Sequence, residues 1–173
     1  MTNDLIGSTL GQYTLVSVIG EGGLATVYKA HQTNLDRWVA VKVLHSKDQN
    51  VLARFEREAK TVAQLRHRNI LMVYEYGLTD DRPYIAMEYV EEGTLENYLN
   101  NEPMDWMRAV SIGMAMAEAL HYAHQHGLIH RDVKPSNILM PQPDWPLLAD
   151  FGLVKMSNQE KALTATGMIM GTP

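Results

Sequence analysis

The sequence predicts an α+β fold, in which a small antiparallel sheet with one helix is followed by the first part of a mainly helical lobe. Two observations support this prediction. Between residues 12 and 90, short runs rich in Val, Ile and Tyr alternate with turn residues, whereas from Thr94 onward apolar residues recur at helical spacing. With 173 residues, of which 46% are hydrophobic, the chain is long enough for one domain or for two small lobes.

The first predicted strands flank a glycine-rich turn. Residues 15–30 read LVSVIGEGGLATVYKA, which is two β-type runs on either side of Gly20, Gly22 and Gly23. A turn with so little side chain can bring backbone N–H groups close to a triphosphate. Since ordinary hairpins also use glycine, this motif alone is equally consistent with a structural turn.

A lysine stands inside the next predicted strand. Residues 39–44 form an apolar run around Lys42, and a lysine in such a place needs a partner. Residues 52–65 are predicted to be a helix, with Glu58 on its apolar face. We therefore expect a partly buried ion pair between Lys42 and Glu58, although a residue at the edge of the stripe could also reach solvent.

The remaining elements follow from the same patterns. They are predicted as strands at residues 70–76 and 84–90, a turn at residues 79–83, a short helix around Leu95 and Leu99, and a long helix from Asp105 to His126. Asp105 is the expected N-cap, and Gly127 ends the long helix. The inward stripe of this helix is predicted to consist of Trp106, Val110, Gly113, Met114, Ala117, Leu120 and His124. We expect part of it to form an exposed apolar patch that makes residues 1–173 prone to aggregation.

The residues needed for phosphoryl transfer are grouped in two short segments. Residues 130–137 read HRDVKPSN, and the triplet DFG begins at Asp150, thirteen residues after Asn137. Phosphoryl transfer needs a carboxylate that orients a hydroxyl nucleophile, a cation that neutralises charge, and oxygen donors for Mg²⁺. Asp132 suits the first role, Lys134 the second, and Asn137 with Asp150 the third.

In order and in spacing, these motifs resemble those of the protein kinases. The glycine turn, Lys42 in its strand and Glu58 on its helix extend the resemblance upstream. It implies that Asp132, Lys134, Lys42 and Glu58 are catalytic, with the pair formed by Lys42 and Glu58 positioning the α- and β-phosphates. The sequence departs from the family pattern at two positions of the turn, where Ala25 replaces the third glycine and Leu24 occupies the tip.

The resemblance also implies a nucleotide site. Met87 takes the gatekeeper position, and the Glu88 carbonyl and the Val90 N–H become the adenine contacts. A core strand with its exit turn would produce the same local pattern. The implied nucleotide-binding residues are Ile19, Gly20, Glu21, Gly22, Gly23, Val27, Ala40, Lys42, Met87, Glu88, Val90, Asn137, Leu139 and Asp150, of which Asn137 and Asp150 would also hold the metal.

The implied function is phosphoryl transfer from ATP, with Mg²⁺, to serine or threonine hydroxyls of a protein substrate. Lys134, two residues after Asp132, is the serine/threonine signature of this loop, and the glycine turn resembles the bacterial Hanks-type enzymes. Two other interpretations fit the same motifs. The chain could be an ATP-binding or interaction module without activity, since the Ala-Pro-Glu motif and the rest of the large lobe do not follow Pro173. It could also be a small-molecule kinase.

The expected organisation has three parts. Residues 1–11 are a lead-in, residues 12–90 a nucleotide-binding small lobe, and residues 91–173 a partial large lobe. Within the last part, phosphate on Thr164 or Thr166 is expected to pair with Arg131 and to order the segment.

Composition excludes several other classes. The net charge is −5 and basic residues do not cluster, so nucleic acid is not expected as a partner. Cysteine is absent, which leaves neither disulfides nor thiolate metal sites, and the four histidines between His121 and His130 are not expected to bind zinc. The sequence shows neither a signal peptide nor eighteen consecutive apolar residues. We therefore expect a cytoplasmic protein or the cytoplasmic portion of a longer membrane-anchored kinase.

Overall fold

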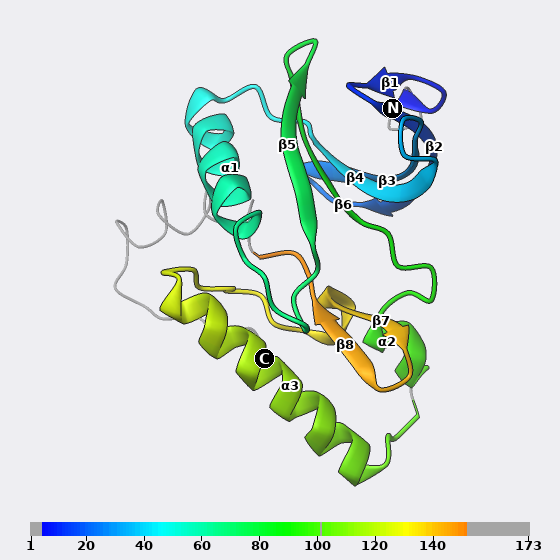
Figure 1. Ribbon diagram of the computed structural model, residues 1–173, viewed down its shortest axis with the longest axis vertical. Helices are drawn as coiled ribbons and strands as arrows, with labels where there is room; N and C mark the ends of the chain where they lie inside the picture. Colours follow the sequence, from blue (N-terminus) through cyan, green and yellow to red (C-terminus); the bar gives the residue numbers. More distant parts are fainter. Residues whose placement is uncertain (1–4, 101, 152–173) are drawn as a thin grey trace.

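The computed structural model describes residues 5–100 and 102–151, and Figure 1 shows their arrangement in an upper sheet and a lower part crossed by a long helix. The upper sheet is antiparallel, with strand order β1-β2-β3-β4-β6-β5. Its strands are β1 (Thr9–Leu10), β2 (Tyr13–Glu21), β3 (Ala25–Gln32), β4 (Arg37–Leu44), β5 (Val73–Thr79) and β6 (Arg82–Glu88). The predicted small lobe with an antiparallel sheet is therefore confirmed.

Helix α1 (Gln49–Val62) covers one side of this sheet and packs against β5. It begins three residues before the predicted start because the Asp48 side chain accepts a hydrogen bond from the Asn50 N–H at 2.8 Å. Phe55 and Ala59 are fully buried on its inner face, as the helical spacing predicted. The opposite side of the sheet has its own apolar cluster, around Tyr13, Tyr28 and Val41.

The lower part contains two helices and a hairpin. Its elements are α2 (Leu95–Leu99), α3 (Trp106–Gln125), the 3₁₀ turn η2 (Pro135–Asn137), β7 (Ile138–Gln142) and β8 (Trp145–Leu148). Both predicted helices are confirmed, and Asp105 caps α3 by accepting hydrogen bonds from the N–H groups of Met107 and Arg108. No element was assigned from the sequence to the hairpin of β7 and β8, a stretch that contains three prolines, which are uncommon inside strands.

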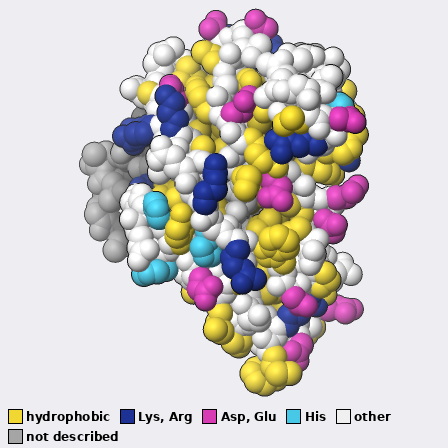
Figure 2. Space-filling view, viewed as in Figure 1, with side chains coloured by type: hydrophobic (Ala, Val, Ile, Leu, Met, Phe, Trp, Pro, Cys, Tyr) yellow, Lys and Arg dark blue, Asp and Glu magenta, His cyan; other side chains and the backbone are white. Residues whose placement is uncertain are grey.

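The predicted inward face of α3 is wrong. Ile112, Met116, Ala119 and Ala123 are the buried residues of this helix, whereas the predicted stripe points largely to solvent. Apolar residues occur all around α3, so periodicity did not fix its orientation; the structure places the small Ala119 and Ala123 against the core. The exposed members of the stripe include Trp106 (71% exposed), Val110 (52%) and Met114 (62%). Figure 2 accordingly shows hydrophobic side chains at the surface where α3 begins, at the lower end of the molecule.

Two short backbone pairings connect the sheet with the lower part. The Leu71 N–H donates to the Leu148 carbonyl at 3.0 Å, and the Leu148 N–H donates to the Asn69 carbonyl at 2.8 Å. The Met140 N–H donates to the Gly93 carbonyl at 3.0 Å. Residues 70–72 therefore belong to this connection, which explains why β5 begins three residues after the predicted strand.

Within the described part of the chain, we find no helix with the length and apolar character that a membrane crossing requires. Thr164 and Thr166 lie outside the described residues.

Candidate active site

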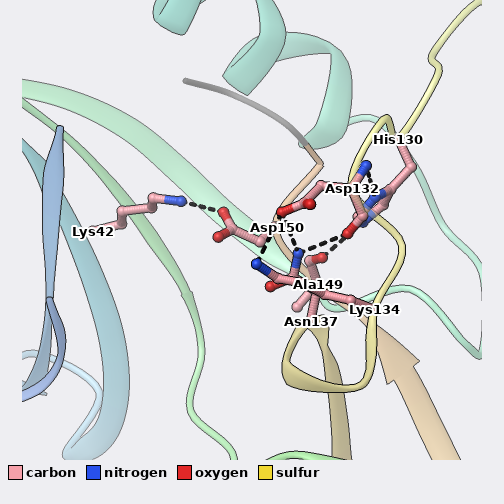
Figure 3. A network of polar contacts seen from close by, with 7 residues as sticks. All are labelled: Lys42, His130, Asp132, Lys134, Asn137, Ala149 and Asp150. Atoms are coloured by element: carbon pink, nitrogen blue, oxygen red, sulfur yellow. Dashed lines mark hydrogen bonds and ion pairs between the residues drawn. The ribbon is translucent and has the colours of Figure 1, made fainter. Parts of the chain in front are cut away.

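His130 joins the two segments that carry the predicted chemistry. Its side chain is 1% exposed and packs against the Phe151 ring at a centroid distance of 4.7 Å. The Asp132 N–H donates to Nδ1 at 3.3 Å, so Nε2 carries the ring hydrogen and donates to the Ala149 carbonyl at 2.8 Å (Figure 3). Burial lowers the pKa of His130, which favours this neutral form. The predicted packed histidine is thus confirmed.

The backbone on both sides of this contact is held in an uncommon conformation. Arg131 has a φ of 63° and Asp150 a φ of 61°, the left-handed region that non-glycine residues rarely adopt. Such conformations persist where the surrounding contacts determine them, and they are common at active sites. Here they flank the contact of His130 with Ala149, next to Asp132, which lines the cleft, and to Phe151, which packs against the His130 ring.

Asp132, Lys134 and Asn137 form a connected group. The Asn137 amide nitrogen donates to both the Asp132 carbonyl, at 2.8 Å, and the Asp132 carboxylate Oδ2, at 3.0 Å. The Lys134 ammonium lies 3.3 Å from the same Oδ2 (Figure 3). Pro135 starts the turn η2, which carries Asn137 into the site, and the Ala149 N–H donates to the Asn137 carbonyl at 2.9 Å. The carboxylate of Asp132 is therefore oriented by neighbours on its own loop.

Lys42 pairs with Asp150. The lysine is 9% exposed on β4, and its ammonium donates to Oδ1 of Asp150, the only ion pair that Lys42 makes within the described residues. The predicted partner, Glu58, instead lines a separate cavity of about 270 Å³ with Arg131 and Phe151. Burial raises the pKa of Glu58, and the Arg131 charge opposes that rise. The expected pair of Lys42 with Glu58 is thus not formed in this structure, because Asp150 already satisfies the buried cation.

The cleft above this group is closed on the other side by the glycine turn. A cavity of about 870 Å³ is lined by the turn and by the catalytic group. The Gly22 N–H donates to the Ala25 carbonyl at 2.9 Å, which closes the turn. A smaller cavity of about 210 Å³ shares Gly20, Val27 and Lys42 with it and extends to the end of β6.

Every predicted nucleotide-binding residue lines one of these two cavities. The larger one is lined by Glu21, Gly22 and Gly23. The smaller one is lined by Ile19, Gly20, Val27, Ala40, Lys42, Met87, Glu88, Val90, Asn137, Leu139 and Asp150. The structure thus brings together residues from strands β2, β3, β4, β6 and β7, from the turn η2, and from the segments that follow β2, β6 and β8.

Some lining residues were missed by sequence reasoning. Ser136 and Tyr89 stand between predicted residues, and their position was a usable signal. Ala149 directly precedes Asp150, so the same signal marks it. Leu71 reaches the smaller cavity through its backbone pairing with Leu148, and Glu96 reaches the larger one from α2. No local motif marks Leu71 or Glu96, since only the packing of distant segments brings them to the cleft.

The donor set fits a magnesium ion. Asn137 offers an amide oxygen, because its nitrogen is engaged with Asp132, and Asp150 keeps a second carboxylate oxygen beside the one paired with Lys42. Both residues line both cavities. Amide and carboxylate oxygens are the hard ligands that Mg²⁺ prefers.

The site lies between a small antiparallel sheet and a helical part, and the glycine turn faces the loop that carries Asp132, Lys134 and Asn137. This arrangement is that of a protein kinase. Residues 13–173 match the family described as the protein kinase domain, to which this chain therefore belongs. A probable serine/threonine-protein kinase of Clostridium perfringens is 40% identical over 173 residues, which cover 97% of this chain and 25% of that protein.

Solved structures agree with this assignment. The crystal structure of the PknI kinase domain of Mycobacterium tuberculosis matches with a TM-score of 0.76 and 35% identity, over 87% of this chain and 62% of that one. The crystal structure of Rad53 residues 1–466 in complex with AMP-PNP matches with a TM-score of 0.75 and 28% identity, over 82% of this chain and 38% of that one. The chain thus spans about a quarter of the length of the curated relative and less than two thirds of each solved chain.

Proposed function

We propose that this chain carries the nucleotide site and the catalytic loop of a serine/threonine protein kinase, and that it transfers the γ-phosphoryl group of ATP to protein hydroxyls. The observation that supports this most is the convergence of Asp132, Lys134 and Asn137 with the pair formed by Lys42 and Asp150, beneath one glycine turn. The likeness to a structure solved with AMP-PNP supports an adenine nucleotide as the bound ligand.

Each side chain has a defined role in this proposal. The Asp132 carboxylate orients the substrate hydroxyl and accepts its proton while the oxygen attacks the γ-phosphorus and the bond to the β-phosphate breaks. Lys134, 3.3 Å from that carboxylate, neutralises charge on the transferring group. Lys42 contacts the α- and β-phosphates. Asn137 and Asp150 would hold Mg²⁺, which when bound supplies charge neutralisation at the β- and γ-phosphates.

Glu58 is the one catalytic candidate that lies outside the cleft. We propose that α1 can bring Glu58 to Lys42, as the family resemblance implies, and that the arrangement described here is an alternative in which Asp150 takes its place. Glu58 is partly buried, and its raised pKa shows that the ionised carboxylate is not fully compensated where it lies. This is consistent with a residue that exchanges partners.

We also propose that the functional division follows the predicted one, with the lead-in at 1–11, the small lobe at 12–90 and the partial large lobe at 91–173. A kinase that uses ATP works where ATP is available, so we propose a cytoplasmic location for this part of the protein. Its partner in the reaction would be a protein that presents serine or threonine.

The proposal is tested by incubating the purified chain with Mg²⁺ and γ-labelled ATP, together with a generic basic protein or with an aminoglycoside. Label on serine or threonine of the protein supports the proposal, provided that the Asp132→Asn variant loses it. Label on the aminoglycoside would instead identify a small-molecule kinase. Binding of Mg²⁺-ATP without transfer to either acceptor would identify a nucleotide-binding module and would overturn the proposed activity.

A further inference from the structure

A cation and two aromatic rings meet where the chain leaves the sheet. The Lys29 ammonium on β3 lies 4.8 Å from the centre of the Trp38 ring and 4.6 Å from the centre of the Tyr89 ring. The Glu91 carboxylate is 4.0 Å from the same ammonium. Trp38 belongs to β4, whereas Tyr89 and Glu91 follow the end of β6. Lys29 thus links two strands of the sheet to the segment that leaves it.

This cluster lies beside the smaller cavity. Lys29 is paired with Ala40 across the sheet, and paired residues share a face. Ala40 lines the cavity together with Tyr89 and Val90. The Lys29 side chain therefore lies on the same face of the sheet as Ala40, and its ammonium extends to Trp38, two residues before Ala40 on β4.

The sheet itself holds only the start of the exit segment, and Val90 packs against the apolar cluster of Leu71, Leu147 and Ala149. β6 ends at Glu88, whose N–H donates to the Met72 carbonyl at 2.9 Å, so the sheet ladder holds the segment only up to this residue. Tyr89 and Glu91 are two residues apart and both contact Lys29. The lysine side chain is 23% exposed, so its interaction with the rings is only partly screened by water.

We propose that Lys29 is a positioning residue, which holds residues 89–91 against β3 and β4 and thereby sets the wall of the cavity that receives the adenine ring. The proposal goes beyond the catalytic group, because Lys29 contacts neither that group nor the glycine turn. Only one part of the proposal, the effect of Lys29 on adenine binding, rests on the proposed function. Its effect on the backbone of residues 89–91 is a property of the free chain.

The first measurement is amide hydrogen exchange of the free chain. Lys29→Met keeps the length of the side chain but removes its charge, and we expect exchange at the Glu88 N–H, which is hydrogen-bonded to the Met72 carbonyl where the segment leaves the sheet, to become about 3- to 10-fold faster. Lys29→Arg keeps the cation and should restore the slow rate. The matched control is Lys60→Met, which removes an exposed lysine paired with Glu56 on α1 and should leave this rate unchanged.

The second measurement compares two ligands. Lys29→Met should weaken adenosine binding by about 3- to 10-fold but leave the binding of inorganic tripolyphosphate unchanged. A general loss of structure would weaken both ligands. Tyr89→Leu removes the ring that Lys29 contacts, so it should match Lys29→Met without adding to it in the double variant.

The outcomes separate the two proposals. Unchanged exchange at the Glu88 N–H in Lys29→Met, or a failure of Lys29→Arg to restore slow exchange, overturns the positioning role. A wild-type chain that binds neither adenosine nor tripolyphosphate overturns the proposed function. In that case, the exchange rates still decide whether Lys29 positions the segment.

Discussion

Replacing His130 should destabilise the chain by an amount that the structure allows us to work out. His130→Ala leaves the buried Ala149 carbonyl without its donor, which costs about 1–3 kcal/mol. It also removes the ring contact with Phe151, worth about 0.5–1.5 kcal/mol. The sum is about 1.5–4.5 kcal/mol, and since each kcal/mol lowers Tm by about 2–4 °C in a chain of this size, we expect a Tm lower by about 3–18 °C.

Thermal unfolding followed by circular dichroism at pH 7.5 measures this loss. The matched control is His124→Ala, because His124 is an exposed histidine on α3, and substitutions at such sites usually change stability by less than about 0.5 kcal/mol. If the two variants melt at the same temperature, His130 does not join the two segments as described.

The same residue predicts a pH dependence. The folded pKa of His130 lies below its ordinary value of 6.5, so below pH 6.5 the unfolded chain takes up a proton that the folded chain does not. The stabilising contribution is therefore complete above pH 6.5 and is lost as the pH falls towards the folded pKa, by at most about 1.4 kcal/mol per pH unit. Between pH 7.5 and 5.5, the wild type should lose more stability than His130→Ala. Parallel curves would refute the assignment.

Three further predictions concern the acidic residues. Asp132→Asn should reduce phosphate transfer about 10²- to 10⁴-fold while the ATP affinity stays within twofold, as measured by steady-state kinetics and calorimetry, and unaltered turnover would refute its role. Asp150→Ala removes one of the two proposed metal ligands, so the nucleotide affinity measured by calorimetric titration should no longer depend on Mg²⁺. If the affinity still depends on Mg²⁺, other residues bind the metal. Since the folded pKa of Glu58 is raised, its contribution to stability is present below pH 4.5 and is lost as the pH rises through the folded pKa. Glu58→Gln should therefore raise Tm at pH 7, and an unchanged or lower Tm would show that the ionised form is well compensated.

The sequence predicted the site better than it predicted the packing around it. The chemistry of Asp132, Lys134 and Asn137 lies within six positions of one loop, and short motifs of this kind keep their local geometry. The predicted nucleotide-binding residues, which the resemblance to the protein kinases implied, line the two cavities. The first prediction uses local information, whereas the second depends on the order of the motifs along the chain.

The errors concern contacts between distant segments. Whether Lys42 pairs with Glu58 or with Asp150 depends on where α1 lies, and the motifs, which predicted Glu58 beside Lys42 and Asp150 only as a metal ligand, carry no information on that position. The orientation of α3 was equally undetermined, because apolar residues surround the helix and only the fit of Ala119 and Ala123 against the core selects a face. Element boundaries shifted where a cap or a distant pairing, such as Asp48 at α1, set the end.

The pairing of residues 69–71 with β8 has a consequence for how the chain folds during synthesis. Pro146, whose carbonyl accepts a hydrogen bond from the Asn69 side chain, lies 77 positions after Asn69. At about 5–20 residues per second, the ribosome needs roughly 4–15 s to make that interval. The upper sheet is thus complete in sequence well before its connection to the lower part can form, and during that time Leu71 and its neighbours lack their final partner. Leu71, which is buried in the finished structure, is therefore an apolar residue that stays accessible to chaperones over this interval.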